Sequence, residues 1–391
     1  MPDPPFIRLV AGQPYRLLFP TGTLLSIFGA ILWPLHAWGA LPAYPAVAHA
    51  RIMSQGFLAC FVFGFLGTAA PRLIGAPGLT ATEVFSLASL LISSACLHAA
   101  GRTLWADQIF LLALLFFIGS LAVRIIVRKD VPPPSFLIAA LGLLCALAGD
   151  ALFIFGPLAD LPPWHDALAR LLMYQGFLLL PVLGVGAFLL PRFFGTPNRQ
   201  DFPESFAPPE GWTAATGWAL ACGVAVIVSF VIEAAGLVMT AKLIRSAVVI
   251  GYLVWQLPPN RARATGTISR CVAAALFFLA CAYPVSAFAP PPPIAWAHVL
   301  FIGGFALLTV AVATRVILGH SGGGHRFSKP IRPLQVFAGM AILAMATRVS
   351  ADFLPKIRLS HLAYAGVAWI VGLIVWSIAI LPGTTKPEPD E

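Results

Sequence analysis

Long apolar runs alternate along the whole chain with short polar or proline-rich segments. A helix needs about 20 apolar residues to cross the hydrocarbon layer of a membrane. Backbone groups that face lipid must be satisfied within their own segment, so helices are the form expected for such runs. The pattern predicts an all-α, polytopic membrane bundle of about twelve transmembrane helices, forming a single membrane domain over residues 1–391. The predicted spans are 17–38, 47–70, 81–100, 106–127, 135–156, 166–190, 212–232, 236–256, 267–288, 294–318, 333–354 and 360–381.

The composition supports a membrane protein independently of any single span. Hydrophobic residues make up 59% of the chain and charged residues only 10%, whereas soluble domains carry about a quarter charged residues. The net charge is +9, but the basic residues lie in short connections and form no stripe with interleaved aromatics. We therefore expect membrane lipid, and no nucleic acid, as a partner. The N-terminal segment MPDPPFIRLVAGQPYR is polar and has no secretory signal pattern.

Basic residues concentrate in alternate connections between the spans. Lys and Arg mark the cytoplasmic side of a membrane protein. The pattern predicts a multi-pass protein of the bacterial inner membrane with both termini in the cytoplasm. Arg102, and Lys356 with Arg358, weaken the alternation. The residues that carry it are Arg8, Arg16, Arg128, Lys129, Arg192, Arg199, Arg261, Arg263, Arg326, Lys329 and Arg332.

An internal repeat divides the chain. MSQGFL at 53–58 and PRLIGAP at 71–77 recur 120 residues later, without a gap, as MYQGFL at 173–178 and PRFFGTP at 191–197. A weaker third copy covers 298–315. Small residues and a Pro-Arg end are common in membrane helices, but ungapped identities of this length favour a true repeat. Spans two, six and ten are then equivalent in three repeats of four helices, at about 14–130, 131–260 and 261–385.

Histidines gather at one side of the predicted bundle. Six of the eight lie at the predicted outer ends of spans, whereas helix-capping histidines should divide between both faces. His49 lies two residues into span two, and His298 lies four or five residues into span ten. At about 1.5 Å per residue, their side chains reach a similar depth. Two imidazoles at one depth can hold a haem iron from opposite sides, so we predict a haem between these two spans. His36, His98, His165 and His361 are more typical of interface or capping residues.

Five cations also lie in the outer third of predicted spans. A charged group inside a membrane costs about 2.5–3.5 kcal/mol on insertion scales, so anions are expected nearby. Asp166, Glu233 and Asp352 can serve some of the cations, and the two haem propionates can serve others. Snorkelling or simple ion pairing is the alternative for each cation taken alone. The five are Arg51, Arg170, Lys242, Arg245 and Arg348, of which we predict Arg51, Arg245 and Arg348 as propionate partners.

The second span resembles that of a known respiratory family. HARIM at 49–53, GFLG at 64–67 and PRLIGAP at 71–77 are similar to the second span of subunit I of the haem-copper oxidases. In that family, histidines on spans two and ten of a twelve-span, pseudo-threefold bundle hold a low-spin haem. The matching positions here are His49 and His298. The resemblance implies a bundle like the oxidase core.

Most of the chain resembles the NnrS family more closely. PYRLLFP at 14–20, HARIMSQGF at 49–57, LLPRFF at 189–194 and the stretch 298–322, which ends in TRVILGHSG, carry this resemblance. The family contains haem and copper and is associated with the response to nitric oxide. The resemblance therefore implies two metals, the iron of a haem b and copper. It also implies nitric oxide as a partner.

The chain departs from both families at metal-binding positions. After His49, the NnrS pattern has a second His and a Glu, where this chain has Arg51 and Ile52. Oxidases bind copper through one His on span six and two on span seven, whereas this chain offers only His165. A single bis-histidine haem is therefore favoured over a haem-copper pair. One or two of His36, His98, His165 and His361 can still make an outer copper site near the haem.

The segment GHSGGGHR at 319–326 permits two interpretations. His320 and His325 can ligate a metal together with water or a carboxylate. Alternatively, His320 meets the last carbonyls of a helix that the glycines terminate. The glycines favour the second interpretation, and the family resemblance favours the first. His320 and His165 join His49 and His298 as candidate metal ligands.

Three functions remain open from the sequence. The first is a membrane haem protein that senses or binds nitric oxide, or relieves nitrosative stress. The second is a secondary transporter, because repeats and intramembrane charges are also typical of transporters. The third is a maturation factor that handles haem or copper for other enzymes. The sequence has no Walker loop, no GxGxxG after a strand and no HExxH, and it leaves open whether the protein is an enzyme.

Overall fold

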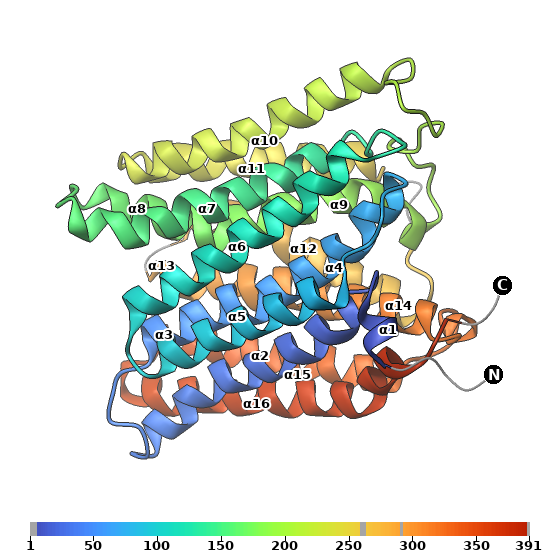
Figure 1. Cartoon of the computed structure of the whole chain (residues 1–391). Helices are drawn as coiled ribbons and strands as arrows, with labels where there is room; N and C mark the ends of the chain where they lie inside the picture. The colour runs from blue at the N-terminus through green and yellow to red at the C-terminus, as the bar shows by residue number, and fades with distance from the viewer. Residues whose placement is uncertain (1–5, 259–262, 290–291, 389–391) are drawn as a thin grey trace. The chain divides into compact units, whose positions relative to one another are not determined.

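A computed structural model describes residues 6–258, 263–289 and 292–388, and every regular element in these ranges is a helix (Figure 1). Twelve helices in the described ranges are long and apolar enough to cross a membrane. The predicted all-α fold and its twelve spans are confirmed. The spans are Tyr15–Ala37, Ala46–Leu73, Ala81–Ala99, Thr103–Ile126, Phe136–Leu158, Trp164–Phe194, Trp212–Ala234, Val238–Gln256, Gly266–Phe288, Ile294–His320, Arg332–Phe353 and Pro355–Thr385.

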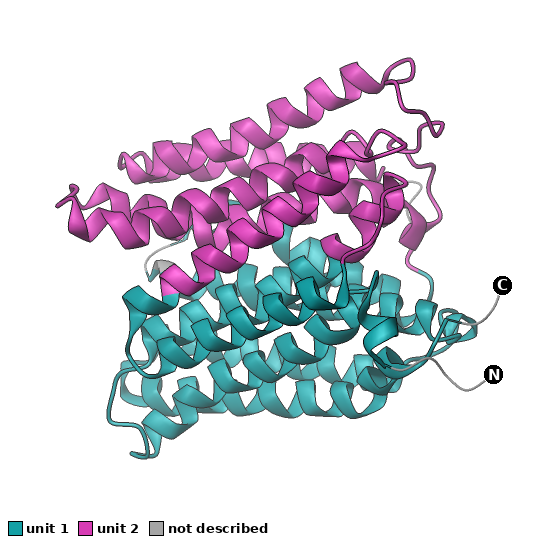
Figure 2. Cartoon of the chain, in the orientation of Figure 1, with its two compact units in different colours: residues 1–65, 80–106, 265–391 teal, residues 66–79, 107–264 magenta. Residues whose placement is uncertain are grey.

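The helices group into two compact units (Figure 2). Unit 1 contains residues 1–65, 80–106 and 265–391, and unit 2 contains residues 66–79 and 107–264. Two of the four boundaries fall inside helices, in α4 (Ala59–Leu73) and α6 (Thr103–Ile126). The division into three repeats of four helices is not tested by this grouping and stays a prediction.

Unit 1 is held together by close approach of small residues and by buried polar pairs. A Cβ atom at Gly22 would lie 2.7 Å from the Cβ of Cys60. The indole of Trp376 donates to the hydroxyl of Thr314 at 2.8 Å. Its helices are α1 (Phe6–Val10), α2 (Tyr15–Ala37), α3 (Ala46–Arg51), α5 (Ala81–Ala99), α12 (Gly266–Phe288), α13 (Pro293–His298), α14 (Leu307–His320), η4 (Gly324–Arg326), α15 (Arg332–Phe353), η5 (Pro355–Ile357), α16 (Arg358–Ile380) and η6 (Leu381–Thr385).

Unit 2 uses the same device between α7 and α9. A Cβ atom at Gly142 would lie 2.4 Å from Cδ of Pro181, and one at Gly184 would lie 2.7 Å from backbone atoms of the facing helix. Small residues let membrane helices approach closely, because lipid supplies no hydrophobic force between them. The helices of this unit are α7 (Phe136–Leu158), α8 (Trp164–Arg170), α9 (Phe177–Phe194), α10 (Trp212–Ala234) and α11 (Val238–Gln256).

Three of the spans contain a π-helical segment, and these are the spans that the sequence repeat makes equivalent. The segments are η1 (Ile52–Leu58), η2 (Leu171–Gly176) and η3 (Val299–Ala306). The repeated Met-x-Gln-Gly motif lies inside η1 and η2. Such segments are rare and are frequent at functional sites. They therefore direct attention to the residues just before them, which include both candidate haem ligands.

Candidate functional site

His49 is oriented by a carbonyl of the neighbouring helix. It lies in α3 just before η1, and its Nδ1 donates to the backbone carbonyl of Gly29 in α2 at 2.9 Å. Gly29 allows this contact because a side chain there would press on Ile52 and Met53. The indole of Trp33 packs edge-on against the imidazole, with ring centroids 5.9 Å apart.

His298 is oriented in the same way from its own helix. It is the last residue of α13, directly before η3, and its Nδ1 donates to the carbonyl of Ile294 at 2.8 Å. The ring of Phe301 stands nearly perpendicular to the imidazole, with centroids 6.2 Å apart. A histidine whose Nδ1–H is bonded to a carbonyl keeps its lone pair on Nε2. Both candidate ligands therefore have the tautomer that binds a metal through Nε2.

The charge of Arg348 acts on both of these histidines. Its guanidinium interacts with both imidazoles, and the two imidazoles interact with each other. Arg348 is buried on α15, where its Nη1 donates to the carboxylate of Asp352 at 2.8 Å. Asp352 also meets Arg358 at 3.6 Å. All three residues belong to unit 1, and their meeting around one cofactor stays a prediction.

The residues of this group fit a bis-histidine haem. Among the described residues, neither Nε2 atom has a hydrogen-bond partner. Metal-ligating histidines usually donate their other ring nitrogen to a carbonyl or a carboxylate, as His49 and His298 do. A buried arginine beside the pair supplies the positive charge that a propionate needs. We call His49, His298 and Arg348 the histidine-arginine group.

Arg51 belongs to a different polar group of unit 1. Its charge interacts with His98 of α5, whose Nε2 bonds to the side-chain oxygen of Gln55 at 2.7 Å. All three side chains are buried. Arg51 follows His49 by two residues, which places the two side chains on different faces of the helix. A role for Arg51 as a propionate partner stays a prediction.

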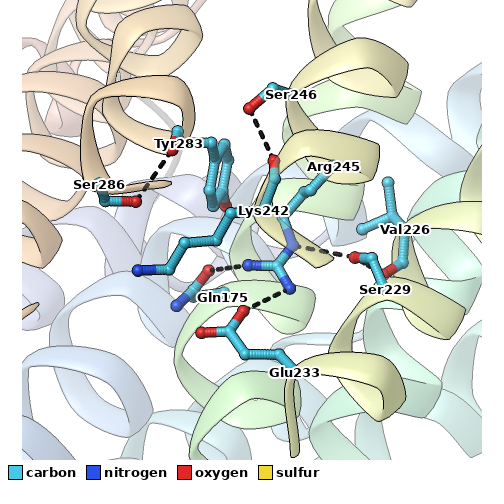
Figure 3. Close-up of polar contacts among 9 residues, drawn as sticks. All are labelled: Gln175, Val226, Ser229, Glu233, Lys242, Arg245, Ser246, Tyr283 and Ser286. Carbon is cyan, nitrogen blue, oxygen red and sulfur yellow. Dashed lines mark hydrogen bonds and ion pairs between the residues drawn. The ribbon is translucent and has the colours of Figure 1, made fainter. Parts of the chain in front are cut away.

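Arg245 lies in unit 2, at the centre of a network between α10, α11 and η2 (Figure 3). It is fully buried and donates to Ser229 at 3.0 Å, to Gln175 at 3.2 Å and to Glu233 at 2.8 Å. Its Cζ atom lies 4.2 Å from the ring centroid of Phe230. Arg245 is thus paired with Glu233 within unit 2, and its predicted role at the haem stays a prediction.

Sequence comparison places these features in a family. The model of the NnrS protein family matches residues 10–387, which is nearly the whole chain. The chain belongs to the NnrS family. No curated protein was found to match it. The matched range includes the histidine-arginine group and the TRVILGHSG segment.

In this NnrS chain, the other two candidate metal ligands have partners of their own. His320 ends α14, 22 residues beyond His298 in the same span, and its Nδ1 pairs with Glu388. Its ring also packs on Tyr15. His165 lies in unit 2 and donates to the carbonyl of Pro162 at 2.8 Å. In the described part of the chain, no three His, Cys, Asp or Glu side chains come together as a metal site.

Three ion pairs join the acids and cations that the sequence places in the outer parts of the spans. Each predicted acid meets one of the predicted cations. The pairs are Arg170 with Asp166 at 2.9 Å, Arg245 with Glu233 at 2.8 Å and Arg348 with Asp352 at 2.8 Å.

Sequence reasoning missed the residues that orient these groups. Gly29 gives no signal because it acts through its backbone carbonyl. Gln55 and Gln175 could have been recognised from the sequence, since the repeat aligns them. In the structure both accept a hydrogen bond from a buried cationic or titratable partner, His98 and Arg245 respectively.

Proposed function

We propose that this NnrS-family protein is a membrane haem protein of the nitric oxide response, with one b-type haem held in unit 1 by His49 and His298. The proposal rests on the hydrogen bonding and the charged neighbour that the two histidines have in common. Both have Nδ1 fixed by a carbonyl and Nε2 without a partner among the described residues, and both interact with Arg348. The family resemblance supports the link to nitric oxide and to nitrosative-stress relief.

In this proposal, the chain's own residues position the two histidine ligands and the charge for a propionate. The carbonyls of Gly29 and Ile294 hold the two rings in a metal-binding tautomer. Trp33 and Phe301 pack against the rings and limit their rotation. Arg348, kept in place by Asp352, offers a charge to a propionate. The haem supplies redox chemistry and affinity for a diatomic gas, which the axial ligands and their surroundings tune.

Exposure of the reduced protein to nitric oxide tests the functional link. A gas can bind a bis-histidine haem only when one ligand leaves. We expect the low-spin bands of the purified, reduced wild-type protein to shift on anaerobic addition of nitric oxide. The high-spin haem that His298→Gly retains should respond at lower gas concentration, because one axial position is already open. A haem-loaded protein whose spectrum ignores nitric oxide would contradict the link.

Copper stays a prediction of the resemblance, as does a role in handling metals for other enzymes. A transporter function is the alternative from another class. The charged network around Arg245 would then mark a substrate path. Metal analysis separates these possibilities, because a transporter would purify without iron.

Arg348 should strengthen haem retention without being a ligand. We expect Arg348→Leu to release haem to a scavenging apo-globin about 10- to 100-fold faster. A hydrogen bond to a charged group contributes about 1.5–3 kcal/mol, and each 1.4 kcal/mol corresponds to a factor of about ten. Arg358→Leu is the matched control, because Arg358 also approaches Asp352 but is half exposed. Equal retention in both variants would remove Arg348 from the haem site.

A further inference from the structure

The later part of the chain carries basic side chains but no acidic ones over a long stretch. Between Glu233 and Asp352 the sequence contains no Asp or Glu. The part of this stretch that belongs to unit 1 begins at Thr265. Most of its Lys and Arg side chains lie at helix ends that the topology predicts to be cytoplasmic, where such charges are common. A binding site requires in addition that the fold gathers them.

Two contacts bring the η4 loop and the start of α15 against the first turn of α12. The backbone N–H of Ile331 donates to the hydroxyl of Thr267 at 3.0 Å, in a buried hydrogen bond. A Cβ atom at Gly266 would lie 2.5 Å from the carbonyl oxygen of Phe327, so this position requires glycine. The loop that joins α14 to α15 is therefore held against the start of α12.

The same contacts gather four cations. Arg270 follows Gly266 by four residues and Thr267 by three, so it lies on the face of α12 that meets the loop. Its side chain is exposed. The loop and the first residue of α15 supply the other three cations, of which Lys329 and Arg332 are also exposed. We call this set the basic corner, and it consists of Arg270, Arg326, Lys329 and Arg332.

The acidic side chains that the structure describes in unit 1 have other partners. Glu83 caps the start of α5. Glu388 pairs with His320, and Asp352 pairs with Arg348 near the opposite end of α15. The basic corner therefore keeps an excess of positive charge, and such a patch attracts anions.

An open apolar strip begins directly at the basic corner. Arg332, Val336, Gly339 and Leu343 follow one another on α15 at intervals of four, three and four residues, so they share a face of the helix. Val336 is 44% exposed and Leu343 is 51% exposed. A Cβ atom at Gly339 would meet no described atom within 4 Å. A cation therefore stands at the head of an apolar strip with a gap in its middle.

We propose that the basic corner binds the headgroup phosphate of an anionic phospholipid of the cytoplasmic leaflet, and that one acyl chain of this lipid lies along α15 over Gly339. Clusters of Lys and Arg at the cytoplasmic ends of spans recognise anionic headgroups, and the strip supplies the apolar surface that a chain needs. The site goes beyond the haem proposal. It shares no residue with the histidine-arginine group, so either can fail without the other.

Native mass spectrometry of the full-length protein in detergent tests the lipid preference. Phosphatidylglycerol and phosphatidylcholine with identical acyl chains are titrated separately, and the affinity of the first bound lipid is measured. Each Lys or Arg near a headgroup contributes about a fivefold gain, so we expect phosphatidylglycerol to bind at least about tenfold more tightly. Arg270→Gln/Lys329→Gln/Arg332→Gln should remove this preference. A wild-type protein without the preference would overturn the proposal, and that comparison needs no variant to fold.

A second triple variant separates the basic corner from the overall charge of the protein. Arg102→Gln/Lys356→Gln/Arg358→Gln removes the same charge from exposed positions of unit 1 outside the corner. We expect this variant to keep the preference for phosphatidylglycerol. An equal loss in both triple variants, each shown to be folded by circular dichroism and gel filtration, would indicate a response to net charge and refute a site at the corner.

Filling the apolar strip tests the acyl chain and distinguishes a lipid from free phosphate. Gly339→Trp places a ring on the open face without changing the charge, and it should lower the affinity for phosphatidylglycerol several-fold. Gly119→Trp in unit 2 is the matched control, because a Cβ atom there also meets nothing within 4 Å. A large excess of inorganic phosphate should leave the lipid bound. Displacement by phosphate, or equal affinities in the two glycine variants, would contradict the placement of the chain.

Discussion

Replacement of His49 or of His298 by alanine should abolish the low-spin haem spectrum of the purified protein. Each substitution removes one of two axial ligands, and the remaining imidazole cannot hold the iron in a six-coordinate, low-spin state. We expect the double variant to lose nearly all bound haem and each single variant to keep at most a high-spin fraction. Haem content and optical spectra after identical purification measure both effects.

His36→Ala is the matched control for this experiment. His36 also lies in unit 1 and is half buried, and its Nδ1 also donates to a carbonyl, that of Leu41 at 2.9 Å. We expect this variant to keep the wild-type spectrum. If the three single variants behave alike, whether all retain haem or all lose it, the assignment of the ligands is wrong.

Removal of Arg245 alone should be the most destabilising single change in unit 2. Arg245→Leu leaves the carboxylate of Glu233 without its partner in a largely buried site and also breaks the bonds to Ser229 and Gln175. Breaking a buried ion pair from one side costs about 3–5 kcal/mol. We expect the free energy of unfolding, measured by denaturant titration in detergent, to fall by about that amount.

Two further variants serve as controls for this prediction. Arg245→Leu/Glu233→Leu removes both charges and should recover most of the stability, because replacing a whole buried pair by apolar residues is often nearly neutral. Arg170→Leu breaks the pair with Asp166, which is exposed on both sides, and should cost at most about 1 kcal/mol. Similar losses in Arg245→Leu and Arg170→Leu would show that burial of the Arg245 network adds no stability.

The spans were predictable because the bilayer fixes the length of an apolar helix. Each predicted run corresponds to a helix in the structure, with small differences at the ends, such as 166–190 predicted and Trp164–Phe194 observed. The π-helical segments were not predictable from the same pattern. Apolar residues fill both faces of spans two, six and ten, so the sequence contains no period that separates a π turn from an α turn.

The candidate site was predictable only in part. Depth along a span can be counted from sequence, and this placed His49 and His298 at one level. Depth does not give the direction in which a side chain points around the helix. Arg51, Arg245 and Arg348 all lie at a suitable depth, yet of the three only Arg348 acts electrostatically on both histidines. Arg245 is in unit 2 with Glu233, a pairing that depends on the folded hairpin of α10 and α11.

We propose that two imidazoles from distant parts of the chain share one iron. The most direct measurement is a reduced-minus-oxidised optical spectrum of the purified wild-type protein, combined with iron analysis. We expect about one haem per chain with sharp low-spin bands. A colourless protein without iron, purified from cells supplied with haem, would contradict it.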